Sequence, residues 1–210
     1  MGTAAVRTRI KICGITRTAD ARAAAAAGAD AIGLVFYPPS PRFLSAERAR
    51  EIRDALPPFV QTVALFVNAD AAQVSQVIGS VHPAMLQFHG EESPEFCRQF
   101  GLPYVKACRV KKGVPALEYL RPFSGAAAWL FDSHVPEYGG VGESFDWSLV
   151  PATDKPVILS GGLSQANVAE AVRRVRPWGV DVSSGVESAK GIKDAGKIAA
   201  FIAEVRNADL

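Results

Sequence analysis

The sequence predicts an α/β fold, a single-domain (β/α)₈ TIM barrel that takes in residues 1–210. Short β-branched runs alternate with helical patterns along the chain, which is typical of parallel strands joined by helices. There are eight such runs in 210 residues. This spacing corresponds to a repeat of roughly 26 residues, near the lower size limit for a closed barrel.

The predicted strands are short, almost continuously apolar and followed by polar or glycine residues. This pattern is expected of parallel strands that are buried on both faces. They are residues 9–15, 31–36, 61–67, 84–89, 104–110, 127–132, 156–160 and 179–183. An open doubly wound sheet has the same alternation, so periodicity alone does not exclude it, but the number of strands favours a closed barrel.

Helical patterns lie between most of these strands. They are residues 19–27, 46–56, 71–78, 94–100, 114–120, 165–175 and 195–205. Capping hydroxyls are expected at Thr18, Ser45, Ser93 and Ser164, and C-terminal caps at Gly28 and Gly101. The segment between the sixth and seventh strands is rich in glycine and proline, which predicts a long loop with at most a short helix near 144–149.

The composition is that of a soluble globular protein with a core, since 49% of the residues are apolar and 21% are charged. The 23 basic and 21 acidic residues are spread along the chain, and no basic stripe suited to nucleic acid is present. No apolar stretch approaches the roughly 20 residues of a membrane helix. The polar start lacks a signal peptide's apolar segment. We therefore expect a cytoplasmic protein with no nucleic-acid or membrane partner.

The cysteines do not form a recognisable framework. Cys13, Cys97 and Cys108 are odd in number and lack the close paired spacing of zinc sites and redox motifs. We expect neither a disulfide framework nor a metal site, and the ordinary role of such a cysteine is that of a small buried apolar residue.

The active site of such a barrel lies at the carboxyl ends of its strands, so residues there carry functional weight. The first strand ends in KICGIT at 11–16, and its alternation places Lys11 and Cys13 on one face, predicted to line the barrel. A lysine two residues away is expected to lower the thiol pKa from its free value of about 8.5. Cys13 is thus a candidate base or nucleophile, although a buried cysteine is often inert.

A carboxylate at the end of the sixth strand, Asp132, is the candidate acid. An aspartate just after an apolar strand is often only a turn residue. Paired with Cys13 across a barrel mouth, it could move protons on opposite sides of one substrate.

Glycine-rich turns follow the last two strands, at SGGLS (160–164) and DVSSGV (181–186). Such barrels frequently bind phosphate after strands seven and eight, where glycines let the backbone approach and amides at a helix start face the anion. Gly161, Gly162, Ser183 and Ser184 are the predicted phosphate-binding residues. Each turn alone would also fit an ordinary structural turn.

Two further side chains are candidates for substrate contact. Three prolines stiffen the loop that carries Arg42, which could hold its guanidinium ready for a planar carboxylate. His89 ends the fourth strand and is directed at the rim. A solvated loop arginine and a structural histidine are the alternatives.

Taken together, these segments resemble the phosphoribosylanthranilate isomerase family, in order and over nearly the full chain. The matching segments are KICGIT (11–16), SPR (40–42), FVN (66–68), QFHG (87–90), FDW (145–147), SGGL (160–163) and DVSSGVE (181–187). The chain departs from the family pattern at Val141, where a threonine is usual, and at Phe88, where a leucine is usual. Neither departure touches the proposed acid or base.

The resemblance implies a cofactor-free Amadori rearrangement of N-(5-phosphoribosyl)anthranilate in tryptophan biosynthesis. It assigns Asp132 as the general acid and Cys13 as the general base. Arg42 would bind the anthranilate carboxylate, and backbone amides around Gly162, Ser183 and Ser184 would bind the phosphate. Asp181 takes a supporting role near Cys13 or the sugar hydroxyls, and His89 is a substrate contact.

Other interpretations stay open at this point. A related histidine-pathway isomerase, or a dual-substrate form of it, resembles a barrel with two catalytic aspartates, and Cys13 argues against it. A non-catalytic barrel that only binds a phosphorylated ligand would not need Cys13 and Asp132 together. The sequence is equally compatible with a monomer and a homodimer.

Overall fold

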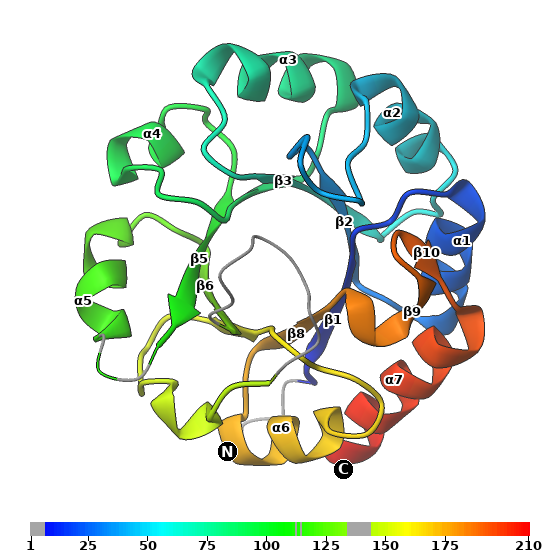
Figure 1. Cartoon of the computed structure of the whole chain (residues 1–210), viewed down its shortest axis with the longest axis vertical. Coiled ribbons are helices and arrows are strands. Elements are labelled where there is room, and N and C mark those ends of the chain that lie inside the picture. The colour runs from blue at the N-terminus through cyan, green and yellow to red at the C-terminus, as the bar shows by residue number, and fades with distance from the viewer. Residues whose placement is uncertain (1–6, 112, 114, 134–143) are drawn as a thin grey trace.

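The computed structural model of the protein describes residues 7–111, 113, 115–133 and 144–210. Eight parallel strands close into a barrel in chain order, and β8 pairs back to β1 (Figure 1). The predicted (β/α)₈ barrel is therefore confirmed. The open doubly wound sheet is excluded, because its first and last strands would not pair in this way.

The strands of the barrel all overlap their predicted ranges. They are β1 (Arg9–Cys13), β2 (Ala31–Val35), β3 (Gln61–Phe66), β4 (Met85–Phe88), β5 (Tyr104–Val110), β6 (Ala128–Ser133), β7 (Val157–Leu159) and β8 (Gly179–Val182). The seam between β8 and β1 is reinforced by the C-terminus, since Asp209 accepts hydrogen bonds from the Thr8 amide at 3.0 Å and from its hydroxyl at 2.6 Å.

The helices surround the barrel. They are α1 (Thr18–Ala27), α2 (Ala46–Asp54), α3 (Ala71–Val81), α4 (Pro94–Arg98), α5 (Ala116–Leu120), α6 (Val168–Val175) and α7 (Ala195–Ala208), with the short 3₁₀ turns η1 (Arg121–Phe123), η2 (Trp147–Leu149) and η3 (Ser184–Val186). The turn η2 lies where a short helix was predicted in the long crossover. None of the described helices is long and apolar enough to cross a membrane.

Two of the predicted helix caps are confirmed by hydrogen bonds. The Ser45 hydroxyl accepts from the Arg48 amide, and the Ser93 hydroxyl accepts from the Phe96 amide. The prediction for Thr18 is wrong, because Thr18 is already the first helical residue and its predecessor occupies the cap position. Gly28 ends α1 in the left-handed conformation, as predicted.

The seven described helices each differ from their predicted range at one end, by one to three residues, and, besides that at Thr18, two of these differences bear on the predicted caps. The helix expected at 165–175 begins only at Val168, because the Asn167 side chain forms a turn: it accepts from the Ser164 amide and donates to the Gly162 carbonyl. A local side-chain bond of this kind competes with helix formation. The helix α4 ends at Arg98, so Gly101 is not its cap.

A short antiparallel hairpin follows β8 and was not predicted. It consists of β9 (Glu187–Ala189) and β10 (Ile192–Lys193). The hairpin packs against the start of α1, where the Lys193 amide donates to the Asp20 carboxylate at 3.1 Å. Figure 1 shows it in orange beside the barrel rim.

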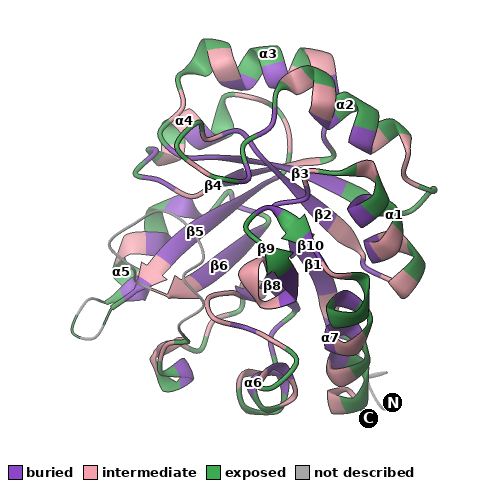
Figure 2. Ribbon diagram, turned by 45° about the vertical axis from the view of Figure 1, so that its right-hand side comes forward, coloured by how far each residue is buried: buried purple, intermediate pink, exposed green. Residues whose placement is uncertain are grey.

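The core has an inner and an outer part, and the barrel strands are mostly buried (Figure 2). Inside the barrel, small and branched side chains fill the space: Val105, Ala107, Ala128, Leu130 and Ile158. A larger cluster lies between strands and helices and contains most of the buried aromatic rings. Because the barrel interior is packed with apolar side chains, the polar residues at the strand ends are available for a site at the rim.

Candidate active site

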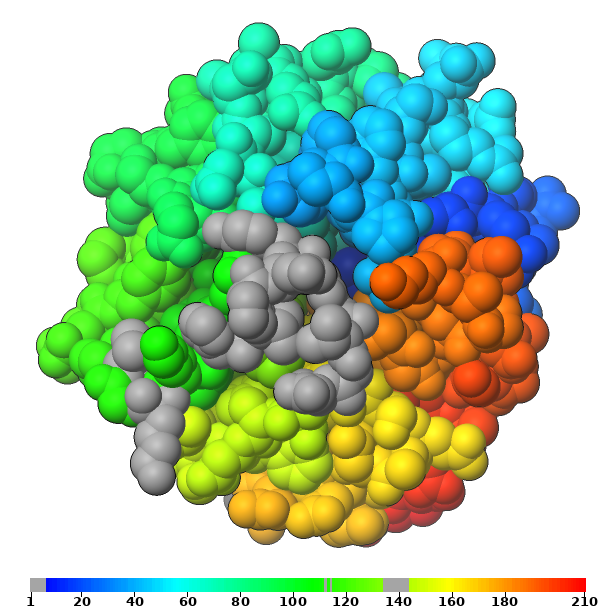
Figure 3. Space-filling view, in the orientation of Figure 1, coloured from blue at the N-terminus to red at the C-terminus, as the bar shows by residue number. Residues whose placement is uncertain are grey.

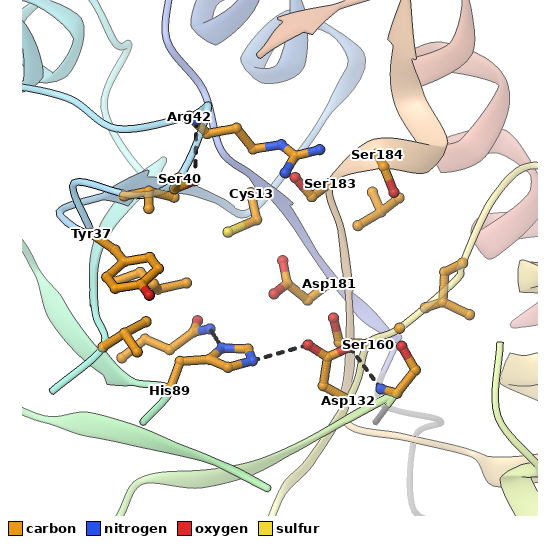
Figure 4. Close-up of a pocket in the computed structure, with 18 of the residues that line it drawn as sticks. Cys13, Tyr37, Ser40, Arg42, His89, Asp132, Ser160, Asp181, Ser183 and Ser184 are labelled. Carbon is orange, nitrogen blue, oxygen red and sulfur yellow. Dashed lines mark hydrogen bonds and ion pairs between the residues drawn. The ribbon is translucent and has the colours of Figure 1, made fainter. Parts of the chain in front are cut away.

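A pocket opens at the carboxyl ends of the barrel strands. It is lined by all nine residues that the sequence predicted as site residues: Cys13, Arg42, His89, Asp132, Gly161, Gly162, Asp181, Ser183 and Ser184. Figure 3 shows this face of the molecule, where the loop after β2 (light blue) and the hairpin β9–β10 (orange) border the central hollow. In the close-up of Figure 4, Asp181 lies between Cys13 and Asp132.

Cys13 ends β1, and its side chain lies on the barrel-lining face, as the alternation predicts. Gly33 on the neighbouring β2 makes room for it, since a methyl group there would come within 2.6 Å of the sulfur. Burial raises the pKa of Cys13 above its ordinary value, and the nearby Lys11 ammonium opposes this rise without overcoming it. The predicted lowering of the thiol pKa is therefore wrong.

Lys11 lies below Cys13 and forms a buried ion pair with Asp181. The ammonium is 2.9 Å from Asp181 Oδ2, across the seam between β1 and β8. Burial alone would lower the pKa of Lys11, but the Asp181 carboxylate and the Cys13 thiol outweigh it and the pKa is raised. The second oxygen, Asp181 Oδ1, is buried and has no hydrogen-bond partner among the described atoms.

Asp132 reaches the pocket from β6 and is held by two hydrogen bonds. Its Oδ1 accepts from the Ser133 amide at 2.8 Å, and its Oδ2 lies 3.0 Å from His89 Nε2. The Gln87 amide nitrogen donates to His89 Nδ1 at 3.0 Å. A neutral His89 therefore carries its proton on Nε2 and donates it to Asp132. Gln87 and His89 together fix the orientation of the predicted acid.

The turn after β7 approaches Asp132 so closely that only glycine fits. Gly161 has φ of 83°, and a methyl group there would lie 2.4 Å from the Ser133 amide nitrogen and 2.8 Å from Asp132 Oδ1. We expect Gly161→Ala to displace Asp132 and to lower kcat at least about tenfold, since proton transfer depends on position. Steady-state kinetics would measure this.

Gly101→Ala is the matched control for that substitution. Gly101 has φ of 68° and open space around it, so alanine there has a similar backbone strain, roughly 1–2 kcal/mol, without touching the site. Equal kcat losses in the two variants would refute the positional explanation.

The predicted phosphate-binding turns lie side by side. A methyl group on Gly185 would come within 1.9 Å of the Leu163 carbonyl oxygen, which shows how tightly the turns after β7 and β8 pack. Because α6 begins only at Val168, the Gly161–Gly162 turn does not lie at a helix start, and the expectation of a helix-start site there is wrong. The residues of the two turns themselves line the pocket.

Arg42 lies in the pocket but is not a free loop arginine. It is buried and forms a two-point ion pair with Glu187 of β9, Nε to Oε1 and Nη2 to Oε2, both at 2.8 Å. The hydrogen bonds that Arg42 donates to Glu187 raise the pKa of Arg42 above its ordinary value. The pair uses two of the five N–H donors of the guanidinium, and the others are available to a ligand.

Sequence reasoning missed the residues that support the site. Glu187 was part of a matched segment without a role, and Lys193 had no local signal at all. Gln87 is 1% exposed and was treated only as part of a strand end. Among the described residues, no group of three or more His, Cys, Asp or Glu side chains is arranged to hold a metal ion.

Fold and pocket together define a (β/α)₈-barrel enzyme whose reactive side chains lie at the strand ends. The family model described as N-(5'phosphoribosyl)anthranilate (PRA) isomerase matches residues 10–204. The chain belongs to this family, and it is an isomerase of tryptophan biosynthesis.

Individual relatives agree with this assignment. The chain is 54% identical over 204 residues to N-(5'-phosphoribosyl)anthranilate isomerase of Leptothrix cholodnii, covering 97% of this chain and 93% of that protein. It is 56% identical over 201 residues to the enzyme of Pseudomonas paraeruginosa, covering 95% of each.

Solved structures also resemble the chain. Phosphoribosyl anthranilate isomerase of Thermotoga maritima matches with a TM-score of 0.89 and 43% identity, over 95% of this chain and 99% of that one. A structure in complex with reduced 1-(o-carboxyphenylamino)-1-deoxyribulose 5-phosphate matches with a TM-score of 0.83 and 37% identity, with the same coverage. The Thermotoga maritima protein is described as dimeric, and monomeric forms of it have been made.

Proposed function

We propose that the chain converts N-(5-phosphoribosyl)anthranilate into 1-(2-carboxyphenylamino)-1-deoxyribulose 5-phosphate by general acid–base catalysis. The observation that carries this mechanism is the placement of Cys13 and Asp132 in one pocket, from β1 and β6, with Asp181 between them in the view of Figure 4. An acid and a base on different sides of one substrate are what an aldose–ketose isomerisation needs.

In the first step, Asp132 protonates the ribose ring oxygen. The C1–O bond breaks, its electron pair stays on the oxygen as a hydroxyl, and the amine nitrogen donates its lone pair to form a protonated Schiff base. The hydrogen bonds from the Ser133 amide and His89 hold the carboxyl group in position for this transfer. His89 therefore supports the acid in addition to its proposed contact with the substrate.

In the second step, the Cys13 thiolate removes the proton from C2. The electrons of the C–H bond form the C1–C2 double bond of an enolamine, and the π electrons of the C1–N bond return to nitrogen. The enolamine becomes the C2 ketone when C1 gains a proton and the C2 hydroxyl loses one. The thiol acts as a base and forms no covalent bond to substrate. Asp181 Oδ1 is buried and has no hydrogen-bond partner among the described atoms, which supports a role for it as the acceptor of a hydrogen bond from a sugar hydroxyl.

The charged ends of the substrate fit two parts of the rim. Arg42 would bind the anthranilate carboxylate, and the backbone at Gly161, Gly162, Ser183 and Ser184 would bind the phosphate.

The proton transfers need no cofactor. Residues 1–210 would act as one domain in the cytoplasm. The oligomeric state stays open between monomer and homodimer, and Val141 lies outside the described residues.

The activity is tested by mixing the purified protein with freshly generated phosphoribosylanthranilate and following the loss of anthranilate-type fluorescence. Fast loss that scales with protein concentration is expected, with the ketose phosphate as product. Absence of catalysis would favour a barrel that only binds a phosphorylated ligand or acts on another phosphosugar.

The activity should rise with pH beyond neutrality. Because burial raises the pKa of Cys13, the neutral thiol predominates at neutral pH and the thiolate fraction grows about tenfold per pH unit as pH approaches the raised pKa. The ascending limb of kcat/KM is therefore expected to have its midpoint above the pKa of a free cysteine.

The thiolate can be observed directly by ultraviolet absorbance as the difference between wild type and Cys13→Ser. The absorbance of Cys97 and Cys108 is common to both proteins and cancels in this difference. Burial also raises the pKa values of these two thiols, to about 12 and about 11. A Cys13 midpoint below the pKa of a free cysteine would contradict the expected effect of burial.

A further inference from the structure

The unpredicted hairpin β9–β10 contributes two buried charged side chains next to the pocket. The side chain of Lys193 is fully buried and that of Glu187 is 6% exposed. Neither residue lines the pocket. Buried charges are costly unless they are paired, so their position beside the rim calls for an explanation.

Lys193 uses its three N–H donors on three acceptors. Its ammonium donates to the Ser183 carbonyl at 3.0 Å, to the Ser183 hydroxyl at 3.3 Å and to Glu187 Oε1 at 2.9 Å. An ammonium has three donors, so these bonds leave none for a ligand. Lys193 thus holds both the backbone and the side chain of Ser183, where the turn after β8 faces the pocket.

Glu187 connects this lysine to the other end of the pocket. Its Oε1 accepts from both Lys193 and Arg42, and its Oε2 accepts a second bond from Arg42. Figure 4 shows Arg42 and Ser183 on the same side of the pocket. A single carboxylate therefore joins the residue proposed for the carboxylate of the substrate to the turn proposed for its phosphate.

The charges of this cluster do not cancel. Burial lowers the pKa of Lys193 below its ordinary value, but the three acceptors around its Nζ match the three donors of an ammonium. Arg42 is cationic, and Glu187 is anionic because its two cationic partners outweigh burial and hold its pKa below the ordinary value. The cluster carries one net positive charge. A buried cluster with an excess positive charge attracts an anionic ligand more strongly than an exposed cation would.

We propose that Lys193 and Glu187 are positioning residues through which the hairpin holds both anion-binding parts of the site, Lys193 fixing the phosphate turn and Glu187 fixing Arg42. This inference rests on the proposed function. It predicts that each residue governs the recognition of a different end of the substrate, although neither touches it.

The test uses three ligands: the reduced product, its dephosphorylated form, and its phenyl analogue without the carboxylate. Isothermal titration gives the Kd of each ligand. The phosphate factor is the Kd of the dephosphorylated form divided by that of the reduced product, and the carboxylate factor is the Kd of the phenyl analogue divided by that of the reduced product. In Lys193→Met, the phosphate factor is expected to fall at least about tenfold and the carboxylate factor to change less. In Glu187→Gln, the carboxylate factor is expected to fall more than the phosphate factor.

Lys190→Met is the matched control. Lys190 is an exposed residue at the hairpin turn, and its substitution removes the same charge from the same element. All three affinities of this variant should equal those of the wild type. Circular dichroism and thermal unfolding show whether each variant is folded.

An equal loss of affinity for all three ligands in the folded variants, or no loss of affinity at all, would overturn the proposal. If Lys193→Met does not fold, the carboxylate factor of Glu187→Gln decides the part assigned to Glu187, and Lys193→Gln replaces the methionine variant. Failure of the proposed function is distinguishable, because wild type would then neither bind the reduced product nor isomerise the substrate.

Discussion

Replacing Asp132 by asparagine is expected to lower kcat by about 10²–10⁴, the range that general acid catalysis typically contributes. Asparagine has nearly the same shape and can still accept from the Ser133 amide, which the carboxylate contacts at 2.8 Å. It cannot protonate the ribose ring oxygen. Since the side chain is at the rim, the thermal unfolding temperature should change little, and KM should change less than kcat.

Asp70→Asn makes the same chemical change away from the pocket. Asp70 caps α3 by accepting from the Gln73 amide, and asparagine is an equally good cap, so both stability and activity should be retained. Activity of Asp132→Asn within a few-fold of this control would remove Asp132 as the acid.

Replacing Cys13 by alanine should have an effect of similar size, about 10²–10⁴ in kcat, because no other base takes its place at C2. Asp181 already pairs with Lys11 at 2.9 Å. The remaining activity of this variant should no longer increase with pH in the way expected of a thiolate base. Single-turnover measurements with saturating enzyme would show whether the loss lies in the chemical step.

Cys108→Ala is the control for Cys13→Ala. Cys108 is also a buried cysteine, but it belongs to the core between strands and helices and does not line the pocket. We expect a modest loss of stability there and nearly unchanged kcat. If Cys13→Ala kept more activity than Cys108→Ala, the proposed base would be wrong.

The barrel was predictable because each strand is marked locally. The runs that became β1 to β8 are apolar on both faces and are followed by polar or glycine residues, a pattern that parallel strands require. The same rule brought Cys13 and Asp132 to one rim, since the carboxyl ends of all eight strands meet there. The start of α6 was missed because the Asn167 turn replaces the expected helical hydrogen bonds.

The supporting residues could not be predicted, because their partners are far away in sequence. Arg42 and Glu187 are separated by 145 positions, and the segment 187–193 has no apolar alternation that would indicate strands. The prediction for the pKa of Cys13 was wrong for a related reason. The sequence shows Lys11 nearby but does not show that burial, the larger effect, raises the thiol pKa.

The seam between β1 and β8 also determines when the site can exist during synthesis. Lys11 and Asp181 are 170 positions apart, yet their ion pair lies directly beneath Cys13. A ribosome releases the first strand long before the last, so a nascent chain holds its reactive thiol without the neighbour that completes the pocket. The hydrogen bonds that Thr8 donates to Asp209 extend this dependence to the residue that follows α7. The site around Cys13 therefore requires β8, and a fragment that stops before this strand would lack the carboxylate that pairs with Lys11.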